Sequence, residues 1–454
     1  MPQRVVAFLH VARARATTPG TTAVLAGSLA SGVGAYLFQV IGTRALGTQG
    51  YAPIGVLWTI QYLVLTIPLL SVEAYVTRAV TLHADDPDDL RHRVRAFAAW
   101  TVAVAVTLFS ATWVWRDALF HGSGDGFPFV AGLIVLCFGA YVIIRGWLAG
   151  SSRFSEYGMA TGIESLGRVA FVLPIALVVP SAQWIAWTLP LGPLLVVAWW
   201  WLAAGSRPGP DRPRGALAHG LNEERSRSTG RYLTATTIAN ASSQTLLAAG
   251  PLVLIPLGAS AAQTSVFFIT ITAARAPLVF AIGGILSRVL PPLTRVARAG
   301  DYARLRRIAV GEVSAAFALA ALGAAVGAWI GPPIVALAFG PEFRPEAWFV
   351  ALTAAGVVSA TAALGLNQML IAMGEEIRLV APWVAALTAG ALTVIGLTGS
   401  PTLRVASGFL IGEAVALAGL LSAVLTARPA HSTAQPAGAL AAVGTPAAPG
   451  EPTP

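Results

Sequence analysis

The sequence has no lysine, one cysteine and few charged side chains, and each shortage excludes a class of structure. All 29 basic residues are arginine, and against 20 acidic residues they give a net charge of +9. Cys137 is the only cysteine, which excludes an intrachain disulfide. Charged residues make up 11% of the chain, whereas a soluble globular protein carries roughly 25%. A soluble fold is therefore excluded, and a lipid bilayer must cover much of the apolar surface.

Metal, cofactor and nucleic-acid sites are not expected either. All six histidines fall outside the long apolar runs, so a buried histidine metal site is not predicted. The arginines lie mostly between apolar runs and form no basic domain of the kind that binds nucleic acid. We therefore predict no cofactor, no metal and no nucleic-acid partner.

Hydrophobic residues make up 56% of the chain and gather in runs that are long enough to cross a membrane. A transmembrane helix needs about 20 apolar residues, so the sequence predicts an all-α membrane protein with about twelve spans. The first run is too long for the apolar region of a signal peptide, which has about 7–15 residues, so we expect a retained span. The predicted spans are 21–43, 50–72, 95–115, 127–149, 156–180, 183–204, 232–256, 263–287, 309–337, 347–371, 379–398 and 404–427.

The arginine distribution predicts the orientation. With the N-terminus inside, 22 arginines fall in inside segments, 4 in outside segments and 3 within spans. This bias follows the positive-inside rule. We therefore expect a multi-pass protein of the inner (plasma) membrane with both termini in the cytoplasm.

Short motifs recur in the two halves at similar topological positions. Leu46-Gly47 has a counterpart in Leu257-Gly258, Thr77-Arg78 in Thr294-Arg295, and Ala149-Gly150 in Met373-Gly374. These matches predict two six-helix bundles related by an internal repeat, an arrangement that in transporters places the substrate site at the repeat interface. The expected domains are an N-terminal bundle at 1–204, a cytoplasmic linker at 205–231, a C-terminal bundle at 232–427 and a disordered tail at 428–454.

Two motifs resemble the polysaccharide-biosynthesis flippases of the multidrug/oligosaccharidyl-lipid/polysaccharide exporter superfamily. They are Arg44-Ala45-Leu46-Gly47-Thr48-Gln49-Gly50-Tyr51, between the first two spans, and Arg145-Gly146-Trp147-Leu148-Ala149-Gly150, followed by Arg153. The resemblance implies a flippase, not an enzyme, that moves a lipid-linked (polyprenyl-diphosphate) oligosaccharide or a related glycolipid to the outer leaflet by alternating access. The lipid-linked glycan and membrane lipids are then the expected partners, and a monomer is expected.

Four charged side chains fall near the middle of predicted spans, where a charge is costly and usually marks function. Arg168 and Arg275 come from different halves, and a guanidinium matches phosphate oxygens, so both are candidates to bind the diphosphate. Glu164 and Glu413 are candidates to couple transport to protons. The alternative is purely structural, because Glu164 and Arg168 are four residues apart on one helix and Arg275 could pair with Glu413.

Further polar residues leave two interpretations open. Asn240 and Gln244 lie one turn apart in the seventh span and could contact sugar hydroxyls, or they could only hydrogen-bond between helices. Arg145, near the inner end of the fourth span, is expected to anchor a loop and contact lipid head groups rather than substrate.

Other functions remain as alternatives. They are a drug or metabolite exporter of the same superfamily and, with less support, a membrane glycan polymerase or transferase.

Overall fold

The computed structural model describes residues 20–82, 87–203, 223–276 and 292–427. These residues form helices joined by short turns, with no strand among them. The N-terminal set comprises α2 (Thr21–Val64), the π-helical turn η1 (Leu65–Leu69), α3 (Leu70–Leu82), α4 (Pro87–Val114), α5 (Arg116–Leu119), α6 (Gly126–Gly150), α7 (Phe154–Val178) and α8 (Ala182–Ala203). The C-terminal set comprises α9 (Glu223–Ala248), α10 (Gly250–Leu254), α11 (Ala261–Ala274), α13 (Tyr302–Phe339), η3 (Pro341–Phe343), α14 (Ala347–Ala372), η4 (Glu376–Leu379), α15 (Val380–Gly396) and α16 (Pro401–Thr426).

Each predicted span corresponds to a helix over its described residues, and residues 277–287 of the eighth span lie outside them. Within the described ranges, nine helices are long and apolar enough to cross a membrane, and one of them, Thr22–Thr81, carries the first two spans. The seventh span is α9 with α10, and the eighth begins with the shorter apolar helix α11. Residues 223–231 of the expected linker are helical, whereas the rest of it and the expected tail lie outside the described residues. The all-α membrane fold is confirmed.

The two sets repeat the same pattern of neighbours. In the N-terminal set α2 packs on α7, α3 on α6, α4 on α6, α6 on α8, and α7 on α8. In the C-terminal set the equivalent pairs are α9 with α15, α11 with α14, α13 with α14, α14 with α16, and α15 with α16. The helices therefore correspond one to one in chain order, as an internal repeat requires.

Close backbone contacts repeat at the residue level. A Cβ atom placed on Gly192 of α8 would lie 2.2 Å from the carbonyl oxygen of Glu164 in α7. A Cβ atom on Gly412 of α16 would lie 3.0 Å from the carbonyl oxygen of Ala386 in α15. Small residues allow membrane helices to approach closely. The offsets are 220 (412−192) and 222 (386−164), so Glu164 occupies the position that Ala386 has in the other half.

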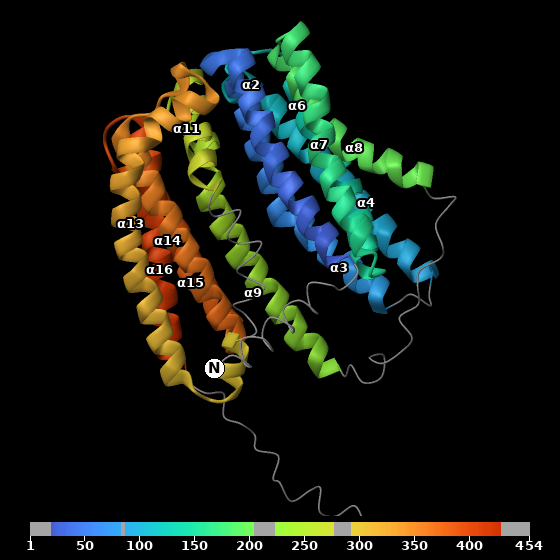
Figure 1. Ribbon diagram of the computed structural model, residues 1–454. Helices are drawn as coiled ribbons and strands as arrows, with labels where there is room; N and C mark the ends of the chain where they lie inside the picture. Colours follow the sequence, from blue (N-terminus) through green and yellow to red (C-terminus); the bar gives the residue numbers. More distant parts are fainter. Residues whose placement is uncertain (1–19, 83–86, 204–222, 277–291, 428–454) are drawn as a thin grey trace, which may run out of the picture.

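The molecule has two different ends along the helix axes. We call one the Gly47 end, because α2 turns there between its two spans. We call the other the Arg-rich end, because α3, α6 and α14 end there and α7 and α13 begin there. In Figure 1 the two sets lie close together where α2 and α11 are labelled, near the Gly47 end.

Side chains at the Gly47 end join the two sets. The Arg44 side chain donates to the carbonyl oxygens of Leu337 and Ala338, with a distance of 3.0 Å for Ala338. These carbonyls belong to the last turn of α13, where a cation interacts favourably with the helix dipole. The Tyr51 ring lies 6.3 Å from the rings of both Phe268 and Phe343. The Gly47 end of the interface is therefore closed.

Gly47 itself provides the bend between the first two spans. Its backbone has φ 68° and ψ 179°, a region that only glycine adopts readily. We expect Gly47→Ala to lower the free energy of unfolding by about 1–3 kcal/mol. Gly311→Ala is the matched control, because Gly311 lies within α13 and its added Cβ would meet nothing within 4 Å. Since alanine favours helix, thermal melting in detergent should show the control unchanged or stabilised, and equal melting temperatures for the two variants would contradict this account.

Candidate functional site

A small cavity lies between the two sets, partway along the interface. Its volume is about 10 Å³, which is room for about one water molecule. Its wall is formed by α2 on one side and by α10, α11 and their neighbours on the other. The lining residues are Trp58, Thr59, Tyr62, Ala248, Pro251, Phe268, Ile271, Thr272 and Arg275. We call this space the seam cavity.

Arg275 supplies the positive charge of the seam cavity. It caps the C-terminus of α11, whose 14 residues span about 21 Å. Its guanidinium carbon lies 4.9 Å from the centre of the Tyr62 ring, and Nη1 donates to the carbonyl oxygen of Leu247 at 3.4 Å. Among the described residues, no carboxylate lies within ion-pair distance of Arg275, so the suggested pair with Glu413 is not formed.

Asn240 and Gln244 lie beside this cavity and contact the opposite set. The Tyr62 hydroxyl lies 3.0 Å from Gln244 Oε1, to which it donates. Asn240 Nδ2 donates to the carbonyl oxygen of Thr66 at 2.9 Å. Both partners belong to one short segment of the N-terminal set, at the end of α2 and the start of η1. The structure therefore brings three predicted substrate ligands, Asn240, Gln244 and Arg275, to one face of the interface.

Two more polar side chains belong to this region. The Tyr36 hydroxyl donates to the carbonyl oxygen of Thr272 at 2.7 Å, which adds another hydrogen bond between the sets. Thr272 lines the cavity, and its buried Oγ1 has no hydrogen-bond partner. A buried hydroxyl without a partner is costly. The seam cavity therefore has unused hydrogen-bonding capacity for water or for a ligand.

Arg168 lies elsewhere, in the core of the N-terminal set. Its side chain is 4% exposed and forms an ion pair with Glu164, one turn away on α7. Its guanidinium carbon also lies 4.9 Å from the Trp58 ring, and 5.9 and 5.8 Å from the rings of Phe38 and Phe138. The structure thus differs from the expectation that Arg168 and Arg275 line one cavity. Arg168 is instead neutralised by Glu164 and covered by aromatic rings.

Glu413 is buried in the C-terminal set. It is 1% exposed, and its Oε2 has no hydrogen-bond partner. The two candidate coupling carboxylates therefore differ, because Glu164 has a cationic partner and Glu413 shows none within the described part of the chain. Burial of a carboxylate without a partner is costly.

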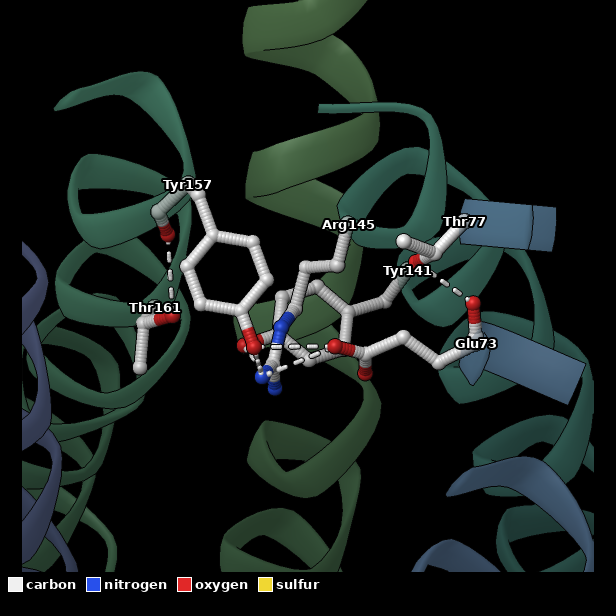
Figure 2. A network of polar contacts seen from close by, with 6 residues as sticks. All are labelled: Glu73, Thr77, Tyr141, Arg145, Tyr157 and Thr161. Atoms are coloured by element: carbon white, nitrogen blue, oxygen red, sulfur yellow. Dashed lines mark hydrogen bonds and ion pairs between the residues drawn. The ribbon is translucent and has the colours of Figure 1, made fainter. Parts of the chain in front are cut away.

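Arg145 belongs to a separate polar network near the Arg-rich end of the N-terminal set (Figure 2). Its Nη2 lies 3.2 Å from Glu73 Oε1, which also accepts from the Tyr157 hydroxyl at 2.8 Å. Arg145 also donates to the Tyr157 hydroxyl, and its guanidinium carbon lies 5.3 Å from the Tyr141 ring. The Arg145 side chain is 17% exposed, and its contacts are those of an anchoring residue. Arg145 joins α3, α6 and α7 from within.

Sequence reasoning missed the aromatic half of the site. Tyr62 contacts Arg275 and Gln244, and Trp58, one turn before it, lines the cavity and contacts Arg168. A weak signal was present, since aromatic side chains four residues apart share one helix face. That signal gives no indication of which side chains from the other half meet this face.

Known structures share this fold at low sequence identity. No family model and no curated protein matches the sequence. A multidrug resistance MATE family transporter of the MOP superfamily, in its inward-facing conformation, is 16% identical and covers 86% of this chain and 94% of its own, with a TM-score of 0.60.

Two further solved structures show the same similarity. One is a MOP superfamily transporter from Pyrococcus furiosus, described as having a binding pocket of reversed polarity that suggests a different function. It is 16% identical over 90% of this chain and all of its own, with a TM-score of 0.50. The other is a mutant MATE transporter of Vibrio cholerae, 14% identical over 90% of this chain and 96% of its own, with a TM-score of 0.50. The described residues thus share the all-helical fold of MATE family transporters of the MOP superfamily, which have twelve helices in two bundles.

Proposed function

We propose that the protein is a flippase that moves a polyprenyl-diphosphate-linked oligosaccharide, or a related glycolipid, to the outer leaflet by alternating access. The observation that carries the proposal is Arg275, a cation in a cavity between two matched helix sets with no carboxylate partner among the described residues. Arg275 is partly buried within a predicted membrane span, where a charge without a counterion is costly. An anionic ligand would supply the missing charge.

The surrounding groups suit a phosphate-linked sugar. A guanidinium binds phosphate oxygens through two parallel hydrogen bonds. The amides of Asn240 and Gln244 and the free hydroxyl of Thr272 can hydrogen-bond to sugar hydroxyls. In this conformation the cavity holds about one water molecule. The sets must therefore separate around Arg275 before a head group can enter, as alternating access requires.

The oligomeric state, the membrane and the orientation of the protein are part of the same proposal. We propose that the protein works as a monomer in the cytoplasmic membrane, with both termini in the cytoplasm and the Gly47 end outside. Glu413 is the better candidate for proton coupling, because Glu164 is already paired with Arg168. The solved MOP transporter with a reversed pocket polarity supports the idea that pocket charge differs within this fold.

Arg275→Gln should slow the transport of a lipid-linked glycan by about tenfold to a hundredfold, the effect of losing one hydrogen-bonding charge. A deletion strain would be complemented with wild type, Arg275→Gln and Arg275→Lys, and lipids would be extracted to measure lipid-linked saccharide on the cytoplasmic leaflet. Lysine keeps the charge but loses the planar pair of donors, so partial recovery is expected.

Arg404→Gln is the matched control, because Arg404 also donates to a main-chain carbonyl, that of Val394, but lies away from the seam cavity. Its transport should match wild type. Wild-type rates for Arg275→Gln would overturn the proposed site. Unchanged lipids together with altered drug sensitivity in the deletion strain would favour an exporter, a function that fits the apolar wall of Trp58, Phe268 and Ile271.

A further inference from the structure

Tyr62 contacts two of the side chains to which the proposed function assigns substrate binding. Its ring faces the guanidinium of Arg275, with 4.9 Å from the ring centre to the guanidinium carbon. Its hydroxyl donates to Gln244 Oε1 at 3.0 Å. Tyr62 comes from α2, whereas Arg275 and Gln244 belong to the C-terminal set. One side chain of the N-terminal set therefore engages two candidate ligands of the other set.

A diphosphate and Tyr62 compete for the same guanidinium. A contact between a cation and an aromatic ring is weaker than a charge-assisted pair of hydrogen bonds to phosphate. The volume of the seam cavity allows no head group beside Tyr62. Binding of an anionic head group to Arg275 must therefore move the Tyr62 ring away and break its hydrogen bond to Gln244.

The neighbouring hydrogen bond, from Asn240 to Thr66, links the displacement of Tyr62 to the relative position of the two sets. Asn240 donates to the carbonyl oxygen of Thr66, one turn beyond Tyr62, inside the π-helical turn that contains Pro68. Helices bend readily at proline and at π-helical turns. A ligand shifts a conformational equilibrium only through contacts that differ between the states. The contacts of Tyr62 exist only while the sets are joined. They therefore differ between the joined and the separated state, and a ligand that breaks them shifts the equilibrium toward separation.

We propose that Tyr62 is the residue that substrate displaces, a specificity-determining side chain that mimics the bound head group and joins the two sets while the site is empty. This inference rests on the proposed function for the chemistry of the ligand. The displacement of Tyr62 frees Arg275 and Gln244 for substrate and loosens the interface in the same step. An empty transporter therefore stays joined at the seam cavity, and a loaded one is released.

The first test measures affinity for farnesyl diphosphate, by calorimetry on the full-length protein in detergent micelles. This probe has no sugar, so it gains nothing from Gln244. Tyr62→Phe keeps the ring and removes the hydrogen bond to Gln244, and it should tighten binding by about twofold to tenfold. Gln244→Ala should tighten binding equally, and the double variant should add nothing further, because all three changes remove the same bond.

The matched control is Tyr36→Phe, which removes a hydrogen bond across the same interface, to the carbonyl oxygen of Thr272, without freeing Arg275 or Gln244. It should tighten binding less than Tyr62→Phe. Unchanged or weaker binding by Tyr62→Phe, additive effects in the double variant, or an equal gain from Tyr36→Phe would each overturn the proposal. No binding by wild type to farnesyl diphosphate or inorganic pyrophosphate would instead remove the diphosphate from the proposed function.

A second measurement needs no ligand and separates these outcomes. Spin labels would be attached to cysteines at Met159 on α7 and Val310 on α13, both half exposed, in a Cys137→Ser background that has no other cysteine. Tyr62→Phe should change the distribution of distances between the labels, and Gln244→Ala should change it in the same way. A distribution identical to that of the labelled parent would show that Tyr62 does not join the two sets.

Discussion

Arg168→Gln is expected to lower the free energy of unfolding by about 3–5 kcal/mol, the cost of removing one partner of a buried ion pair. The change leaves Glu164 in the core of the N-terminal set, with Phe38, Trp58 and Phe138 around the position of the lost guanidinium. Denaturant unfolding in mixed micelles, followed by tryptophan fluorescence, would measure the loss. Surface arginines do not show an effect of this size, because exposed ion pairs contribute only about 0–1 kcal/mol.

The double variant Glu164→Gln/Arg168→Gln is the control for this prediction. It removes both charges together, so most of the lost stability should return, as happens when a buried pair is replaced by neutral groups. Arg275→Gln should unfold nearly as wild type does, since Arg275 leaves no carboxylate unpaired. If Arg168→Gln were stable but failed to transport, Arg168 would be a substrate ligand and the structural interpretation would be wrong.

Span positions and the repeat could be predicted because both depend on local patterns. An apolar run of about 20 residues has few alternatives to a membrane helix. The glycines that allow close approach at Gly192 and Gly412 occur at matching places in the two halves, so the repeat is visible in the sequence and in the packing alike. The break between the first two spans was predicted as well, and the structure places it at Gly47, whose backbone is not helical.

The partners of the charged residues could not be predicted in the same way. The spacing of Glu164 and Arg168 allowed a pair along α7 or an arginine turned to the cavity. The choice depends on aromatic rings that α2 and α6 supply from elsewhere in the sequence. Likewise, Tyr62 and Gln244 are 182 residues apart, and no local pattern relates them. Such contacts are fixed by the docking of the two sets.

Locking the Gly47 end should abolish transport completely, which is the largest effect expected for this protein. Arg44 of α2 contacts the main chain at Ala338 of α13, so cysteines at these two positions would lie on opposite sides of the closed interface, about the reach of one arginine side chain apart. A short, cleavable reagent that joins two thiols would hold the sets together there. Under the proposed function, alternating access requires this end to open, so the locked protein should leave lipid-linked saccharide on the cytoplasmic leaflet, and cleavage should restore transport.

The control lock stays within one set. Arg116 and Asp125 lie at the same end of the N-terminal set and form an ion pair at 2.8 Å, so cysteines at these positions can be joined without crossing the interface. Both double-cysteine proteins would be made in the Cys137→Ser background and compared before and after treatment. Transport that continues with Arg44→Cys and Ala338→Cys fully joined would exclude opening at the Gly47 end. Arg275 would then have to exchange its ligand by a route that keeps this end closed.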